Sequence, residues 1–116
     1  MRAIQINHHG GPEVMQLTEV SVPTPGQGEV RVSHRACGVN FVDVYFRTGL
    51  YPAKLPLILG AEGAGVIDAI GPGVTHLAIG DRVAYAARTQ GSYAEARILD
   101  ATLLLKLPDA IDFPTG

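Results

Sequence analysis

Two polar residues and two tyrosines that could form one wall of a binding cleft lie within residues 36–52. Asn40 and Asp43 stand three residues apart at the head of an otherwise apolar and aromatic run, and Tyr45 and Tyr51 follow closely. An amide, a carboxylate and two phenol groups could hydrogen-bond a ligand while the rings pack against it. The same residues also fit a capped helix followed by two core aromatics, so both interpretations stay open at this point.

The other chemistry-bearing residues form no catalytic motif. No Ser or Cys has a His in a context that would activate it as a nucleophile, and no residue stands out as an essential general acid or base. Gly60, Gly63 and Gly65 have the reverse of the G-x-G-x-x-G spacing that binds dinucleotides, and the residues after them are typical of a strand. The catalytic residues therefore stay unassigned.

The composition is that of an ordinary globular domain. The 116 residues are 47% hydrophobic and 17% charged, with a formal net charge of −2, which allows one domain with a real core and hardly two. Scattered charges without a basic stripe argue against nucleic-acid binding, and no stretch is long and apolar enough to span a membrane. The N-terminus has no signal-peptide core. A single cysteine is compatible with a reducing cytoplasm, where we expect the protein.

Short alternating segments between turn residues indicate a β domain. The fourteen glycines and eight prolines fall between these segments and not in one linker. Such spacing predicts an antiparallel barrel or sandwich. The expected strands are residues 2–7, 14–20, 29–36, 63–71, 80–87, 91–99 and 102–108.

One segment departs from this pattern. Asn40 is a favoured N-cap, and Asp43 has the capping-box position. Arg47 suits the negative end of a helix dipole, and Gly49 can end a helix in the left-handed conformation. These signals predict a helix from Asn40 to Thr48, which we expect to be largely buried because it is apolar almost all round.

Two residues near these elements are assigned structural roles. His34 falls on the apolar face of the strand at residues 29–36, where we expect a partly buried histidine with satisfied hydrogen bonds. Cys37 is expected to pack as a small apolar group.

The sequence contains three long, ordered motifs: GVNFVDVYFRTGLYP (38–52), LGAEGAGVIDAIGPGVTHLAIGDRVAY (59–85) and GSYAEARIL (91–99). Together they resemble the N-terminal half of a medium-chain dehydrogenase/reductase, and most closely its zinc-independent quinone oxidoreductase, or zeta-crystallin-like, branch. The resemblance covers nearly the whole chain. It implies that residues 1–116 form a mainly β, GroES-like, partly open barrel with one or two short helices. In that family a Rossmann domain follows, and it is expected to be absent from this chain, which looks like a truncated catalytic domain.

The resemblance also bears on metal binding. Zinc-dependent relatives carry a Cys where this sequence has Asn40, and Gly-His-Glu where it has Gly60, Ala61 and Glu62. An amide and a methyl group are poor zinc ligands, and the four-cysteine zinc lobe is missing, so the resemblance implies no zinc. We expect the remaining acid, Glu62, to be structural and paired with an arginine.

The implied activity is metal-free hydride transfer from NADPH to a quinone or conjugated enone. The resemblance assigns Asn40, Asp43 and Tyr45 to the cofactor, and Tyr51 and Phe41 to the acceptor. It implies a parent homodimer without nucleic-acid or membrane partners. This chain alone is expected to be inactive, because NADPH binding needs the second domain.

Two alternatives remain open. An enoyl or acrylyl thioester reductase shares the barrel and the hydride chemistry. A stand-alone GroES-like binding module would be non-enzymatic, and it would need a long glycine-rich mobile loop that the sequence does not clearly contain.

Overall fold

The computed structural model describes all 116 residues, in two antiparallel sheets with one α-helix, α1 (Phe41–Thr48), and two short 3-10 helices, η1 (Pro12–Val14) and η2 (Ala101–Leu103). The smaller sheet has the strand order β2-β1-β4. Its strands are β1 (Arg2–Ile6), β2 (Gln16–Glu19) and β4 (Leu57–Ile58). The larger sheet has the order β7-β3-β5-β6-β8. Its strands are β3 (Glu29–Cys37), β5 (Glu62–Ile70), β6 (Arg82–Ala86), β7 (Ala96–Asp100) and β8 (Leu105–Lys106).

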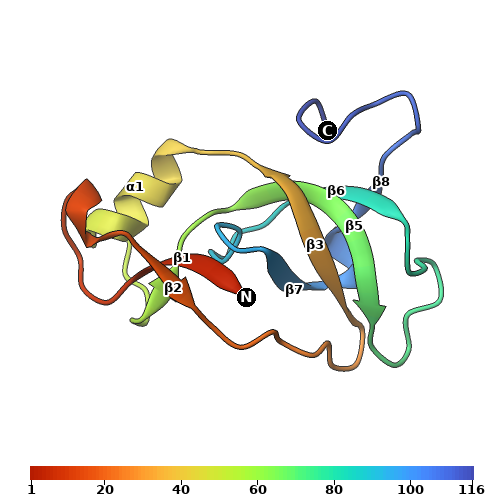
Figure 1. Ribbon diagram of the computed structural model, residues 1–116, viewed down its shortest axis with the longest axis horizontal. Helices are drawn as coiled ribbons and strands as arrows, with labels where there is room; N and C mark the ends of the chain where they lie inside the picture. Colours follow the sequence, from red (N-terminus) through yellow and green to blue (C-terminus); the bar gives the residue numbers. More distant parts are fainter.

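The longest strands, β3 and β5, are neighbours within the larger sheet and form a curved antiparallel pair (Figure 1). Their pairing shifts register between Arg31 and Val32 and again between His34 and Ala36. Such irregularities bend a strand and increase its twist. The pair can therefore curl around the nine-residue core cluster, whose members are Val30, Val32, Ile67, Leu77, Val83, Tyr85, Leu99, Ala101 and Leu104.

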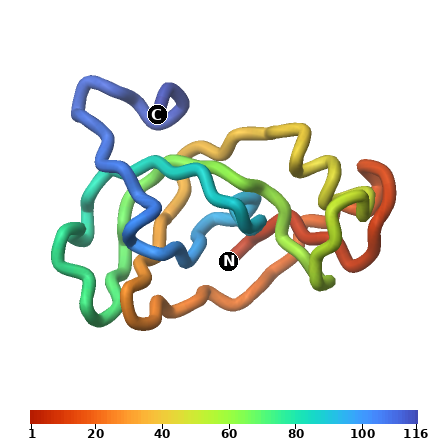
Figure 2. Tube along the Cα trace, turned by 180° about the vertical axis from the view of Figure 1, so that it is seen from behind, coloured from red at the N-terminus to blue at the C-terminus, as the bar shows by residue number.

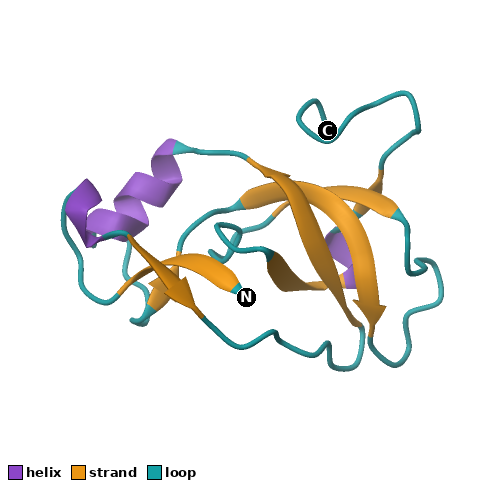
Figure 3. Cartoon of the chain, viewed as in Figure 1, coloured by secondary structure: helices purple, strands orange, loops and turns teal.

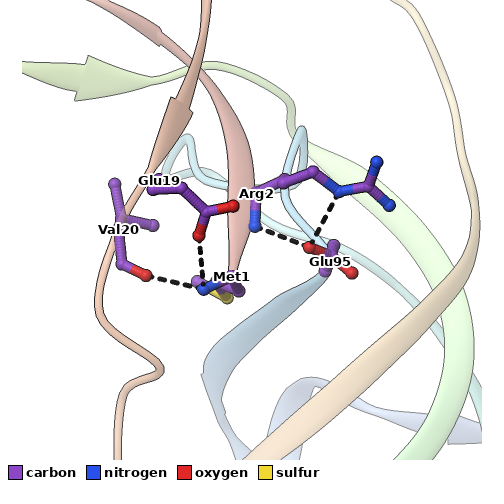
Figure 4. Close-up of polar contacts among 5 residues, drawn as sticks. All are labelled: Met1, Arg2, Glu19, Val20 and Glu95. Carbon is purple, nitrogen blue, oxygen red and sulfur yellow. Dashed lines mark hydrogen bonds and ion pairs between the residues drawn. The ribbon is translucent and has the colours of Figure 1, made fainter.

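The two sheets are joined through the segment before β7. The N–H of Ile4 donates to the carbonyl of Tyr93 at 2.7 Å, and the N–H of Glu95 donates to the carbonyl of Arg2 at 3.0 Å. Figure 4 shows that the carboxylate of Glu95 also accepts from the N–H of Arg2 at 2.6 Å and from its Nε at 3.3 Å. The N–H of His34, in β3, donates to the carbonyl of Glu95 at 2.8 Å. This segment thus closes the barrel on one side.

The mainly β fold predicted from the sequence is confirmed, and all the strands pair antiparallel. A Rossmann domain, which would need a parallel sheet with crossover helices, is not among the elements of these 116 residues. None of the helices is long and apolar enough to cross a bilayer.

Several predicted strand boundaries were wrong. The strand expected at residues 91–99 begins only at Ala96, because residues 91–93 bend around Gly60 and donate their N–H groups to the carbonyls of Gly60 and Leu59. The strand expected at 102–108 shrinks to Leu105–Lys106, since Asp100 caps η2 in front of it. The strand expected at 14–20 starts at residue 16, after η1, and the two-residue strand β4 was not predicted.

The predicted helix is present, but the expectation that it is largely buried was wrong. Helix α1 lies at one end of the molecule beside η1, outside the barrel (Figures 1 and 3). Only one face packs, with Phe46 against the small cluster of Ile6, Val14 and Leu59. Asp43 is the only buried residue of the helix, while Phe41 is 80% exposed.

The residues after β8 extend away from the sheets and turn back above them (Figure 2). Arg82 holds this segment, donating to the carbonyls of Pro108 at 3.0 Å and Ile111 at 2.7 Å. Its guanidinium carbon lies 4.5 Å from the centre of the Phe113 ring. The segment consequently forms one side of a cavity above β3, β5 and β6.

Candidate functional site

The start of α1 has the capping geometry that the sequence predicts. Asn40 is extended, with φ −128° and ψ 155°. Its N–H donates to Oδ2 of Asp43 at 3.1 Å, and the N–H of Asp43 donates to the carbonyl of Asn40 at 3.0 Å. Gly49 ends the helix with φ +87°, and Nε of Arg47 donates to the carbonyl of Gly10 at 3.2 Å. Both helix ends are therefore fixed by specific contacts.

Asp43 is a buried carboxylate held by three donors. Only 3% of the residue is exposed. Besides the N–H of Asn40, its Oδ2 accepts from the hydroxyl of Tyr93 at 2.6 Å, and its Oδ1 accepts from Nε2 of Gln90 at 3.3 Å. Burial, together with the hydrogen bond to Asp43 and its charge, raises the pKa of Tyr93. Neither Tyr93 nor Gln90 was identified from the sequence, because each lies about fifty residues along the chain from Asp43.

The two sequence-predicted tyrosines lie together on the exposed side of α1. The rings of Tyr45 and Tyr51 meet edge to face with 5.4 Å between centroids, and Tyr51 also meets Phe46 at 5.7 Å. Tyr45 is 37% exposed and Tyr51 45% exposed. Asn40, Phe41 and these tyrosines thus belong to one end of the molecule, where the aromatic rings offer apolar surface.

The segment before β5 lies against the same network. Gly60 has φ +105°, and a Cβ there would lie 2.6 Å from the Tyr93 ring, so this position requires glycine. Its N–H donates to Oε1 of Gln90 at 2.7 Å. The next two residues are Ala61 and Glu62, which follow Gly60 into β5.

Glu62 does not have the arginine partner that we expected from the sequence. It takes part in none of the ion pairs of the chain. Its carboxylate instead lies against Gly38, where an added Cβ would collide with it. The arginines are used elsewhere: Arg31 pairs with Asp68, and Arg82 holds the C-terminal segment.

A cavity of about 700 Å³ lies between the ends of β3, β5 and β6 and the C-terminal residues. Cys37, Glu62, Tyr85, Leu103 and Phe113 are among its lining residues. None of the five sequence-predicted site residues lines it. Much of its wall is alanine and glycine, which carry no chemical signal in a sequence.

A buried chain of polar side chains lies beneath this cavity. Nδ1 of His34 is 2.8 Å from the carbonyl oxygen of Ala94, and Nε2 is 2.6 Å from the hydroxyl of Tyr85. That hydroxyl is 2.6 Å from Oγ of Ser92, which accepts from Arg97 at 2.9 Å. The prediction of a partly buried histidine with satisfied hydrogen bonds is confirmed. Arg97, a buried cation that also donates to a threonine, was not predicted.

The expectation that Cys37 packs as a small apolar group was wrong. The residue is exposed, and its thiol donates to the carbonyl of Ser92 at 2.8 Å. Partial burial of the sulfur raises the pKa of the thiol, while the charge of Arg97 acts in the opposite direction.

The structure contains no group of three or more His, Cys, Asp and Glu side chains that could hold a metal ion. The two segments that correspond to zinc-ligand positions in the resemblance carry Asn40 and Ala61. An amide and a methyl group do not form the donor set that zinc requires.

The sequence and fold of this chain are similar to those of known proteins. The alcohol dehydrogenase GroES-like domain matches residues 26–109. The quinone oxidoreductase of Pseudomonas aeruginosa is 50% identical over 113 residues, which are 97% of this chain and 35% of the relative. The solved quinone oxidoreductase of Pseudomonas syringae has a TM-score of 0.95 at 45% identity, covering 98% of this chain and 35% of the other. That of Escherichia coli, solved with NADPH, has a TM-score of 0.95 at 42% identity, covering 97% and 35%.

The chain thus spans about a third of the length of these relatives. The match to the Pseudomonas syringae structure covers both sheets and α1. It therefore includes the three sequence segments on which the resemblance rests. The chain therefore belongs to the alcohol dehydrogenase GroES-like domain family, in the quinone oxidoreductase branch of the medium-chain dehydrogenases/reductases.

Proposed function

We propose that residues 1–116 are the catalytic domain of a longer, NADPH-dependent quinone reductase that works without zinc. The observation that carries the proposal is the similarity, over nearly the whole chain, to quinone oxidoreductases, one of which was solved with NADPH. The close match of folds supports the same use of the domain. We further propose a cytoplasmic homodimer as the parent protein.

The residues on the exposed side of α1 fit a nicotinamide and a planar acceptor. Asn40 provides a neutral amide that could hydrogen-bond the nicotinamide, and the ring of Tyr45 provides apolar surface beside it. Tyr51 and Phe41, exposed next to them, would pack against the acceptor. Asp43 is assigned to the cofactor side of the site through its hold on Asn40, because its carboxylate is already occupied by three donors.

NADPH, when bound, supplies the hydride for the reaction. The residues of this domain would orient the two rings and exclude water from them. Since Asn40 and Ala61 offer no zinc ligand, the acceptor must spread the arriving charge over its own conjugated system, as quinones and enones can. The absence of zinc ligands at Asn40 and Ala61 thus favours conjugated acceptors, such as quinones and enones, as the substrate class.

Quinone-dependent oxidation of NADPH by the full-length protein tests the proposal. We expect turnover with a simple benzoquinone, no loss of activity with a zinc chelator, and a raised KM for NADPH in Asn40→Ala. Absence of quinone turnover, a preference for an enoyl thioester, or inactivation by chelator that zinc reverses would each overturn it. Sedimentation of the full-length protein tests the dimer.

A further inference from the structure

One half-buried side chain, Gln90, hydrogen-bonds both segments that border the proposed site. Its Nε2 donates to Oδ1 of Asp43 in the first turn of α1 at 3.3 Å. Its Oε1 accepts from the N–H of Gly60, just before β5, at 2.7 Å. Asp43 in turn holds the N–H of Asn40, and Gly60 is followed by Ala61. The carboxamide of Gln90 thus connects the Asn40 end of the helix with the start of β5.

Both partners of Gln90 are buried polar groups that need a hydrogen bond. Asp43 and Gly60 are both buried. A buried carboxylate oxygen or N–H that loses its partner carries the full cost of having left water. The orientation of the carboxamide is fixed by chemistry, because only its oxygen can accept from an N–H and only its nitrogen can donate to a carboxylate.

Few side chains could replace Gln90 in this position. Glutamate would keep the acceptor for Gly60 but would face the carboxylate of Asp43 with a second negative charge. Methionine has nearly the same length and provides neither group. The carbonyl of Gly60 accepts from the N–H groups of Gly91 and Ser92 at 2.9 and 3.0 Å, so the backbone on both sides of the contact is anchored as well.

We propose that Gln90 is a positioning residue of this site, which sets the placement of Asn40 relative to Ala61 and Glu62 by holding Asp43 and Gly60 at fixed separation. This inference rests on the proposed function, since it assigns Gln90 a role in the binding of the nicotinamide and acceptor. Gln90 contacts the reacting groups only through other residues, so its effect should appear in binding geometry.

The test compares variants of the full-length protein. In Gln90→Met and Gln90→Glu we expect kcat/KM for NADPH to fall roughly 10- to 100-fold, with a raised KM, since a misplacement of about 1 Å can cost about a hundredfold. Gln16→Met is the matched control, because Gln16 is exposed in β2 and its side chain makes no hydrogen bond. It should keep the wild-type KM.

A double variant, Asp43→Asn with Gln90→Glu, tests the connection directly. An amide at position 43 would donate to the carboxylate at position 90, and its oxygen would still accept from Asn40 and Tyr93. The hydrogen bonds and the net charge are kept while one bond reverses direction. We expect the double variant to recover a lower KM than either single variant.

The KM readout separates positioning from a structural role. A purely structural Gln90 would lower the melting temperature and the amount of active enzyme, and so the apparent kcat, without moving the KM of the folded fraction. Wild-type KM in Gln90→Met, or no recovery in the double variant, would overturn the inference while the quinone reductase assignment stands. If the wild-type protein binds NADPH but reduces no quinone, the proposed function fails, and the same variants are compared through the Kd of NADPH. If it binds no NADPH, both proposals fall.

Discussion

Lowering the pH below 6.5 should destabilise this fold through His34. Nδ1 of His34 faces the carbonyl of Ala94, which can only accept, so this nitrogen carries the hydrogen. In the neutral ring Nε2 is then an acceptor for the hydroxyl of Tyr85. Tyr85 can accept from Ser92, whose oxygen accepts from Arg97. The imidazole hydrogen and both hydroxyl hydrogens of this chain all have acceptors only while His34 is neutral.

The sign of the effect follows from the pKa of His34. Burial lowers this pKa below its ordinary 6.5, the charge of Arg97 lowers it further, and the bond to the Ala94 carbonyl opposes both. The unfolded chain therefore takes up a proton at a higher pH than the native chain does. The contribution of His34 to the free energy of unfolding should be constant above pH 6.5. It should decrease as the pH falls from 6.5 to the pKa of His34 in the native chain. The slope for one proton is at most about 1.4 kcal/mol per pH unit.

Urea denaturation of the 116-residue chain between pH 7.5 and 5.0 measures this slope. His34→Gln should remove it, and His8→Gln is the control because His8 is exposed and makes no hydrogen bond. The comparison between variants cancels the titration of the other groups. Equal loss of stability in wild type and His34→Gln between pH 6.5 and 5.5 would refute the reasoning.

Three further predictions follow from named contacts. Tyr93→Phe removes a 2.6 Å hydrogen bond to the buried carboxylate of Asp43 and should lower the free energy of unfolding by about 1.5–3 kcal/mol in urea titration; a change below 0.5 kcal/mol would contradict it. Ile67→Ala opens a cavity at a fully buried position and should cost about 2–5 kcal/mol in the same assay. Arg97→Gln removes the charge that lowers the pKa of Cys37, so the pH profile of Cys37 alkylation by iodoacetamide should move to higher pH. An unchanged profile would show that the charge of Arg97 does not act on the thiol.

The sequence was informative where a structure is determined locally. The cap at Asn40, the acid at Asp43 and the glycine at Gly49 lie within ten residues, and they predicted α1 correctly. Burial of the helix was mispredicted, because an apolar composition does not reveal whether a helix lies inside a barrel or at its end. Burial depends on what the rest of the chain, or another domain, places over each face.

Contacts between distant residues could not be predicted from the sequence. Gln90 meets Gly60 across 30 positions and Asp43 across 47, and His34 meets Tyr85 across 51. Nothing in the local pattern distinguishes Gln90 from an exposed loop residue. The alternation at residues 91–99 even favoured a strand, and only the fold shows that residues 91–93 bend around Gly60 instead.

The segment from residue 89 to 97 connects the barrel to the proposed site through polar contacts. Gln90 and Tyr93 hold the start of α1, while Ser92 and Arg97 support Tyr85 in the wall of the cavity. No buried side-chain nitrogen or oxygen in the chain lacks a hydrogen-bond partner, so the network is complete. Because directional bonds fix geometry more tightly than apolar packing does, a substitution here should displace α1 relative to β5. Tyr93 also packs against the small cluster of Ile6, Val14 and Leu59, whereas Gln90 belongs to neither hydrophobic cluster. Substitution of Gln90 should therefore impair function before it unfolds the domain.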